Sequence, residues 1–156
     1  MSIIPFKTTF LMNLIPNATA TGSNPADEYP TTVLVVDDEP SILDLLVMML
    51  ESQGFNVLSA ENGARALAMT RTLQAHPINV LVTDLCMPGM SGTELAAELR
   101  VSQPELKAVF ISGLSREEIT AMGVDMSQSA FISKPFQARA INAAVRELIG
   151  RQPSPC

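Results

Sequence analysis

The feature of this sequence that most constrains its fold is a regular alternation, from Thr32 onward, of short apolar segments with longer amphipathic ones. The apolar segments are rich in β-branched residues and predict strands at 33–36, 56–60, 80–83, 108–112 and 130–133. The amphipathic segments predict a helix that starts at Pro40 and is ended by Gly54, helices at 63–75, 93–101 and 137–149, and a short one after Ser115. Strands and helices in this order form a parallel sheet with helices on both faces. Because the crossovers are right-handed, we expect an open, doubly wound α/β fold.

Two of the predicted helices begin with the same capping signal. Ser91 is followed three residues later by Glu94, and Ser115 is followed in the same way by Glu118. In a capping box, the serine hydroxyl accepts a hydrogen bond from the backbone N–H of the acidic residue, whose side chain accepts one from the serine N–H. We therefore expect Ser91 to cap the helix predicted at 93–101 and Ser115 to cap the short helix that follows it.

Length and composition exclude several classes of protein. The 156 residues allow one domain, and a hydrophobic content of 47% excludes disorder of the whole chain. A net charge of −6 leaves no basic patch for binding nucleic acid. Two cysteines and one histidine are too few for a disulfide framework or a zinc site, and no apolar run approaches the roughly 20 residues of a membrane-spanning helix. We expect a soluble, acidic, cytoplasmic domain that binds neither nucleic acid nor membrane.

The composition changes near residue 31. Residues 1–30 carry few charges and four prolines and show neither a helical nor a strand period, so we predict a flexible N-terminal tail. The apolar run at 10–15 loosely imitates a signal peptide, but it is shorter than the usual apolar stretch of about 7–15 residues. We expect the domain to span residues 31–151 and a short C-terminal tail to occupy 152–156.

Polar side chains stand where four of the five predicted strands end. Ligands of a doubly wound sheet bind at the carboxyl ends of its strands, so these side chains are expected to share one edge. In chain order they are Asp37, Asp38 and Glu39 after the first strand, Asp84 after the third, Ser112 at the end of the fourth and Lys134 after the fifth.

This set of side chains suits one kind of chemistry. Clustered carboxylates repel one another, which raises the pKa of at least one of them unless a cation neutralises the charge. Oxygen ligands without nearby histidine or cysteine suit Mg²⁺ or Mn²⁺. A lysine ammonium and a serine hydroxyl can hold further phosphoryl oxygens, and a carboxylate can itself accept a phosphoryl group. The pattern is typical of an acidic pocket that receives phosphate.

Four motifs, in the right order, resemble those of the response-regulator receiver domain. They are VLVVDDEP at 33–40, DLCMPGMSG at 84–92, FISG at 110–113 and KPF at 134–136. The resemblance covers about residues 31–151 and implies a flavodoxin-like sheet with strand order 2-1-3-4-5, which is carried over from the family. It also implies a phosphorylation switch of a two-component system, which takes phosphate from a histidine kinase or histidine phosphotransfer protein and signals to a downstream protein.

The resemblance implies a role for each residue of the acidic pocket. Asp84 would be the phosphoacceptor. Asp38 would bind Mg²⁺ (or Mn²⁺) directly and Asp37 through water, while Asp84 and the backbone carbonyl of Cys86 would complete the protein ligands. Lys134 would pair with the phosphoryl group.

The resemblance further implies a conformational switch. Ser112 would hydrogen-bond the phosphoryl group once it arrives. Phe131, three residues before Lys134, matches an aromatic residue that turns inward when the hydroxyl moves. Pro135 matches a position where the preceding peptide bond is usually cis. The output surface would be the fourth helix, fifth strand and fifth helix, roughly residues 115–149.

Other readings within the family stay open. Because little chain follows residue 151, we expect no output domain of its own and no catalysis beyond its own phosphorylation and slow dephosphorylation. The protein would be a monomer or a dimer formed on phosphorylation. Alternatively, it is the receiver of a hybrid histidine kinase or a relay intermediate that passes phosphate onward.

Readings outside the family fit less well. A phosphatase of the haloacid-dehalogenase type would carry its nucleophile on the first strand and usually a cap insertion. A flavin-binding module would need a Ser/Thr/Gly phosphate loop where this chain is acidic. A receiver-like domain that no longer takes phosphate is disfavoured, since every expected pocket residue is present.

Overall fold

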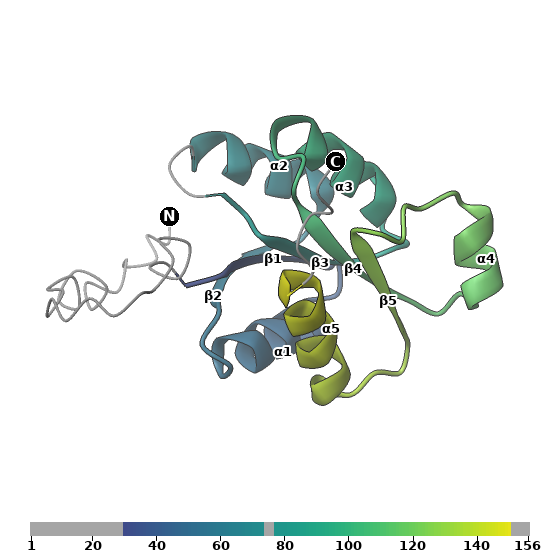
Figure 1. Ribbon diagram of the computed structural model, residues 1–156. Coiled ribbons are helices and arrows are strands. Elements are labelled where there is room, and N and C mark those ends of the chain that lie inside the picture. Colours follow the sequence, from purple (N-terminus) through teal and green to yellow (C-terminus); the bar gives the residue numbers. More distant parts are fainter. Residues whose placement is uncertain (1–29, 74–76, 151–156) are drawn as a thin grey trace, which may run out of the picture.

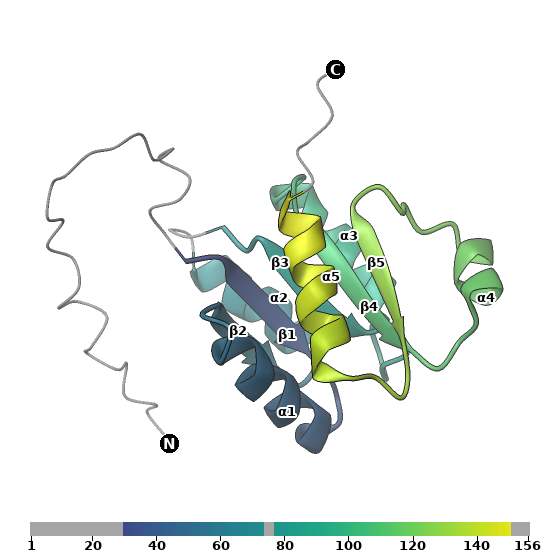
Figure 2. The same ribbon diagram turned by 60° about the horizontal axis from the view of Figure 1, so that its bottom comes forward.

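The computed structural model describes residues 30–73 and 77–150, which form one parallel sheet of five strands with helices on both faces (Figures 1 and 2). The strand order is β2-β1-β3-β4-β5. The strands are β1 (Thr32–Val36), β2 (Asn56–Ala60), β3 (Val80–Asp84), β4 (Lys107–Ser112) and β5 (Ser129–Ser133). The helices are α1 (Pro40–Glu51), α2 (Gly63–Thr72), α3 (Gly92–Ser102), α4 (Arg116–Ala121) and α5 (Ala138–Gly150). The predicted doubly wound fold and its strand order are confirmed.

Each face of the sheet has its own layer of core side chains. Helices α1 and α5 cover one face and α2 and α3 the other (Figure 1). Because successive residues of a strand point to opposite faces, Leu34 and Phe110 pack on the α2–α3 side, whereas Val35 and Ile111 pack on the α1–α5 side. Strands buried on both faces are continuously apolar, and this pattern made them recognisable in the sequence.

Helix α4 differs from the other helices in its attachment. It has six residues, all of which the structure describes, and Ile119 is the only buried one among them. In both views its ribbon lies farther from the sheet than the other helices, beyond the β5 edge (Figures 1 and 2).

The ends of several elements differ from the predictions. Helix α2 ends at Thr72 and not at Ala75, because Leu73 leaves the helical conformation with φ −92° and ψ 47° while its N–H closes the last turn on Met69. Leu73 is 37% exposed, so it adds little to the core. The other helix and strand ends lie about one residue from their predicted positions, which is a common difference at the ends of such elements.

Some predictions fall on parts of the chain that the structure does not describe. The tails predicted at 1–30 and 152–156 lie outside the described residues, apart from residue 30. The domain limits therefore stay predictions. No described helix combines the length and the apolar character that crossing a membrane requires.

Candidate functional site

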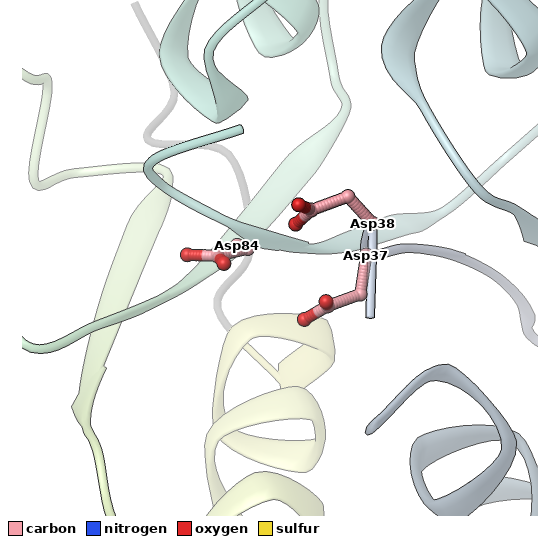
Figure 3. A group of neighbouring side chains, drawn as sticks. All are labelled: Asp37, Asp38 and Asp84. Carbon is pink, nitrogen blue, oxygen red and sulfur yellow. The ribbon is translucent and has the colours of Figure 1, made fainter. Parts of the chain in front are cut away.

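Three aspartates meet at the carboxyl edge of the sheet. Asp37 and Asp38 directly follow β1, and Asp84 ends the neighbouring strand β3 (Figure 3). One carboxylate oxygen of each lies within 4.8 Å of the others. Asp37 and Asp84 are buried whereas Asp38 is exposed, so the group is open to solvent on the Asp38 side. This arrangement brings together the three aspartates that the sequence predicts as metal ligands.

The buried carboxylate of Asp37 is only partly satisfied. Burial raises the pKa of Asp37; the charges of Asp84 and Asp38 raise it further, while a hydrogen bond from the Glu39 N–H and the Lys134 ammonium act against the rise. Its Oδ1 accepts that N–H at 2.9 Å, but the buried Oδ2 has no hydrogen-bond partner among the described residues. A buried acceptor without a partner is costly. A divalent cation with oxygen ligands suits this group of residues.

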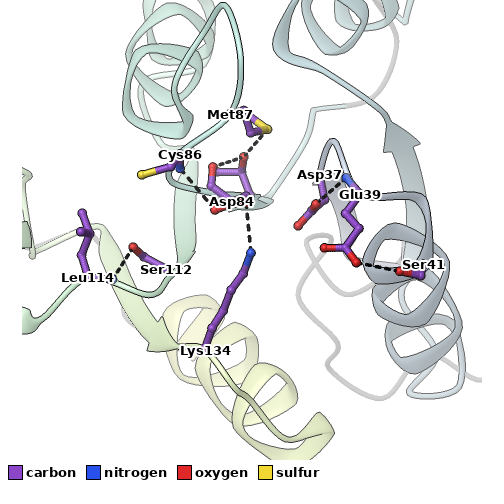
Figure 4. Close-up of polar contacts among 10 residues, drawn as sticks. Asp37, Glu39, Ser41, Asp84, Cys86, Met87, Ser112, Leu114 and Lys134 are labelled. Carbon is purple, nitrogen blue, oxygen red and sulfur yellow. Dashed lines mark hydrogen bonds and ion pairs between the residues drawn. The ribbon is translucent and has the colours of Figure 1, made fainter.

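Lys134 places a positive charge beside Asp84. It follows β5, and its Nζ lies 3.1 Å from Asp84 Oδ2 (Figure 4). Burial works to lower the pKa of Lys134, but the hydrogen bond to Asp84 and the charges of Asp84, Asp37 and Glu39 outweigh it, so the pKa is raised. The ammonium is therefore held charged beside the predicted phosphoacceptor.

The loop after Asp84 engages the same carboxylate. The Cys86 N–H donates to Asp84 Oδ1 at 3.2 Å, so both oxygens of Asp84 accept a hydrogen bond. The Cys86 side chain itself is exposed. The Lys134–Pro135 peptide bond is cis.

The start of α3 holds the backbone of Asp84 in place. Gly92, the first residue of α3, packs so closely on the Asp84 carbonyl that a Cβ at this position would overlap its oxygen. The Gly92 N–H donates to the Leu85 carbonyl at 3.0 Å, and Thr83 Oγ1 donates to the Asp84 carbonyl at 3.0 Å. Gly92 stands in one of the four motifs, but this role was not predicted from the sequence. The available signal was a glycine in the first turn of a helix. Gly92 has no positive φ, so a glycine is needed there because a side chain would not fit, and not because of the backbone conformation.

The acidic group does not include every carboxylate that the sequence places at this edge of the sheet. Three aspartates form it, and Glu39 is not among them. The exposed Glu39 instead accepts a hydrogen bond from Ser41 Oγ at 3.0 Å, in the first turn of α1 (Figure 4).

The two predicted switch residues lie on the neighbouring strands β4 and β5. Ser112 is buried at the end of β4, and its hydroxyl accepts a hydrogen bond from the Leu114 N–H at 3.0 Å (Figure 4). Phe131 of β5 is half-buried and stacks on Phe110, with ring centroids 5.3 Å apart. The partnership with Phe110 was not predicted. A signal for it exists, because Phe110 lies two residues before Ser112 and therefore on the same face of β4.

A cavity of about 450 Å³ lies elsewhere, at the amino ends of β3 and β4. Ile78, Leu106 and Ile149 are among its lining residues. This cavity lies at the opposite end of the strands from Asp84. The candidate site is therefore identified by the chemistry of the carboxylates and not by the presence of a cavity.

The fold and site define a class of protein, and comparison with known families agrees. The chain belongs to the response regulator receiver domain family, whose pattern it matches over residues 33–146. The protein is thus a receiver domain of two-component signalling. Domains of this class work as regulatory phosphoacceptors that interact with histidine kinases or phosphotransfer proteins.

Named relatives include regulators and a kinase. The chain is 32% identical over 126 residues to the probable transcriptional regulatory protein TcrX of Mycobacterium tuberculosis, covering 81% of this chain and 53% of TcrX. It is 31% identical over 121 residues to the sensor kinase CckA of Brucella abortus, covering 78% of this chain and 13% of CckA. The chain therefore spans about half the length of one relative and a small part of the other.

A solved structure agrees over nearly its whole length. The response regulator protein TrrA of Thermotoga maritima, crystallised in complex with Mg²⁺ and BeF, is 30% identical and superimposes with a TM-score of 0.62. The match covers 76% of this chain and 98% of that one.

Proposed function

We propose that Asp84 accepts a phosphoryl group from a phosphohistidine of a histidine kinase or histidine phosphotransfer protein in the cytoplasm. The observation that carries this proposal is the position of the Asp84 carboxylate, which lies in one group with Asp37 and Asp38 and 3.1 Å from the Lys134 ammonium. In the transfer, an Asp84 carboxylate oxygen bonds to phosphorus as the P–N bond of the donor breaks, and the imidazole leaves with the electron pair.

Asp37, Asp38, Asp84 and the backbone carbonyl of Cys86 would hold Mg²⁺, or Mn²⁺ in its place. The unpartnered Oδ2 of Asp37 and the three converging carboxylates support this part of the proposal. When bound, the cation supplies positive charge that offsets the repulsion between the carboxylates and an incoming phosphoryl group. The complex of TrrA with Mg²⁺ and BeF is a precedent among the relatives.

Lys134 would pair with the phosphoryl group, and the Ser112 hydroxyl would hydrogen-bond it. Lys134 already carries its charge next to Asp84, which favours a negatively charged group at that position. Slow dephosphorylation would return the domain to its resting state. The signal would pass to a downstream protein through α4, β5 and α5, roughly residues 115–149, with the chain a monomer or a dimer formed on phosphorylation.

The proposal is tested by reaction with acetyl phosphate in the presence of Mg²⁺, read by intact mass. We expect the wild type to gain one phosphoryl group and Asp84→Asn to gain none, with circular dichroism showing that both are folded. Asp44→Asn, which changes an exposed aspartate of α1, is the matched control and should label like the wild type. Labelling of Asp84→Asn at another carboxylate would contradict the assignment. Absence of labelling in the wild type, from both acetyl phosphate and a phosphorylated histidine donor, would contradict phosphoacceptance itself.

A second role within the class is favoured by the match to the sensor kinase CckA, of which the similar segment forms 13%. In that role the domain would pass its phosphoryl group onward to a histidine phosphotransfer protein. Incubating labelled protein with a panel of such proteins separates the two roles, because a relay intermediate loses its label to one of them within the lifetime of the aspartyl phosphate.

A further inference from the structure

The cavity at the amino ends of β3 and β4 has no role in the proposed function. Its volume of about 450 Å³ falls within the range of about 300–1,000 Å³ that is typical of binding sites, and most of the surface that lines it is apolar. The buried Ile78 and Leu106 line it together with Ile149 of α5, which is 41% exposed. Helices α3 and α5 both end at this edge of the sheet (Figure 2). The cavity thus leaves apolar side-chain surface that an occupant could cover.

The polar groups around the cavity favour an apolar occupant. Gln103 Oε1 accepts the Ile78 N–H at 2.8 Å, and Asn79 Oδ1 accepts a backbone N–H of β1 at 2.8 Å. These acceptors are already used by the backbone of the domain. The two charged residues of the lining, Glu105 and Lys107, have opposite signs, so their net charge selects neither an anion nor a cation. An occupant therefore gains free energy chiefly by burying apolar surface.

The chain itself contains a segment of suitable chemistry. Residues 10–15, with the sequence FLMNLI, carry five apolar side chains and one asparagine, and the proposed function gives this segment no role. The segment is connected to the domain at the cavity, because Thr31, which directly precedes β1, is one of the lining residues.

The connection between the segment and the cavity is short. Residues 16–30 join the two, and a flexible chain of 15 residues has an end-to-end distance of roughly 20 Å. A tether of this kind corresponds to a local concentration in the millimolar range. The same segment of a second chain is far more dilute in a micromolar solution of the protein. The tether therefore favours the segment of the same chain as the occupant.

We propose that residues 10–15 dock in this cavity of their own chain, with their apolar side chains against Ile78, Leu106 and Ile149. Docking would remove the exposed surface of Ile149 and that of the segment from water. An apolar partner that uses the same cavity must first displace the segment. The proposal is independent of phosphoryl transfer, because the cavity and Asp84 lie at opposite ends of β3.

The test is NMR of the full chain with ¹³C-labelled methyl groups of isoleucine and methionine. Met12 lies within the segment, whereas Ile78 and Ile149 line the cavity, and the variants Met12→Leu, Ile78→Val and Ile149→Val assign the three signals. We expect nuclear Overhauser contacts from the Met12 methyl group to at least one of the two isoleucines. Absence of these contacts, together with cavity signals that do not respond to the variants below, would overturn the proposal.

The first pair of variants changes the segment and leaves the domain untouched. Leu11→Asp/Leu14→Asp makes the segment too polar to dock, so the Ile149 signal should shift and its contacts with the segment should be lost. Thr9→Asp/Asn17→Asp is the matched control, because it adds the same charge on either side of the apolar run. This control should keep the wild-type Ile149 signal. Equal shifts in both variants would show a general effect of charge and would contradict docking.

The second pair changes the domain. Ile149→Asp should abolish the contacts between Met12 and Ile78, whereas Val101→Asp should preserve them, because Val101 is 83% exposed on α3 and does not line the cavity. Thermal unfolding followed by circular dichroism shows whether both variants are folded. If Ile149→Asp is not, Ile149→Ala takes its place and should weaken the same contacts. Contacts that persist in a folded Ile149 variant would overturn the proposal.

A synthetic peptide of residues 7–17 tests whether the cavity and the segment recognise each other. Added to Leu11→Asp/Leu14→Asp, it should return the Ile149 signal toward its wild-type position, whereas wild-type protein should respond at much higher peptide concentration because its cavity is occupied. A peptide that shifts neither protein would contradict the proposal. Dilution of the wild type should leave the Ile149 signal unchanged. A signal that moves on dilution would assign the cavity to a second copy of the chain and overturn docking within one chain.

Discussion

Helices α3 and α4 begin in the same way and end up in very different environments. Both open with a capping box, in which Glu94 Oε2 accepts the Ser91 N–H and Glu118 Oε2 accepts the Ser115 N–H, each at 2.8 Å. Helix α3 then runs for 11 residues and buries four of them, whereas α4 runs for six and buries Ile119. The same local signal thus starts one helix that is part of the core and one that lies against its margin.

The difference corresponds to what each helix does beside the site. Helix α3 starts against the backbone of Asp84 through Gly92, so it fixes the position of the predicted phosphoacceptor. Helix α4 is joined to the site through the Ser112–Leu114 hydrogen bond and the loop that follows. The proposed receiving group benefits from a rigid support, whereas α4, as part of the proposed output surface, benefits from a low cost of movement. The comparison can be tested in matched pairs of variants.

The largest expected difference is in core packing. Leu95→Ala in α3 should lower the free energy of unfolding by about 2–5 kcal/mol, the usual cost of a cavity at a fully buried leucine. Ile119→Ala in α4 should cost less than the lower end of that range, because a short helix at the margin can move into the space. Urea denaturation measures both, with an unchanged m-value confirming a comparable transition. Equal losses would show that α4 is as firmly anchored as α3.

The two glycines near these helices form the next pair. Gly92→Ala should destabilise the protein by about 1–3 kcal/mol and slow labelling by acetyl phosphate, because the new methyl group displaces the Asp84 backbone. Gly113→Ala is the control: a Cβ there meets no atom within 4 Å, and the expected change in stability is within about 0.5 kcal/mol. Labelling rates that fall equally in the two variants would contradict the role of Gly92.

Removing the capping serines should have a smaller effect, and a different one for each helix. Ser91→Ala should lower global stability by about 1 kcal/mol, since a cap is worth roughly that much and α3 unfolds with the core. Ser115→Ala should leave global stability nearly unchanged and speed hydrogen exchange of the α4 amides, because α4 can open by itself. Exchange measured by NMR at neutral pH distinguishes these outcomes. Equal global losses would mean that α4 unfolds together with the rest.

The smallest effect is in the titration of the two capping glutamates. Hydrogen bonds from the backbone N–H and then the side chain of Ser91 lower the pKa of Glu94, and those from Ser115 lower the pKa of Glu118 in the same way. A lowered pKa in the folded state stabilises the cap above the ordinary glutamate value of 4.5, and this contribution is lost as the pH falls through the folded-state pKa. Carboxyl ¹³C NMR should show both midpoints below 4.5. In Ser115→Ala the midpoint of Glu118 should return toward 4.5 while that of Glu94 stays low; a shift of both would point to a cause other than the caps.

The strands and the polar residues at their ends could be predicted because short-range patterns determine them. An apolar strand such as β3 is marked by its own residues, and a carboxylate such as Asp84 is placed at an edge by the strand that it ends. The end of α2 was predicted wrongly because a helix stops where burial no longer favours it, and the exposure of Leu73 depends on the surrounding fold. Glu39, which the sequence places among the polar residues of the same edge, accepts a hydrogen bond from Ser41 and is not part of the acidic group.

By itself the sequence determined which elements form, which side chains reach the carboxyl edge and how each capped helix begins, because hydrophobic period and capping act over a few residues. The resemblance supplied the strand order. The tertiary structure decided which side chains meet: Lys134 with Asp84 across 50 positions of the chain, Gly92 with the Asp84 carbonyl, and Phe110 with Phe131. It also decided that α3 buries four of its residues whereas α4 buries Ile119, although both helices begin with the same capping box. Contacts of this kind depend on the packing of distant elements in three dimensions, and no local pattern encodes that packing.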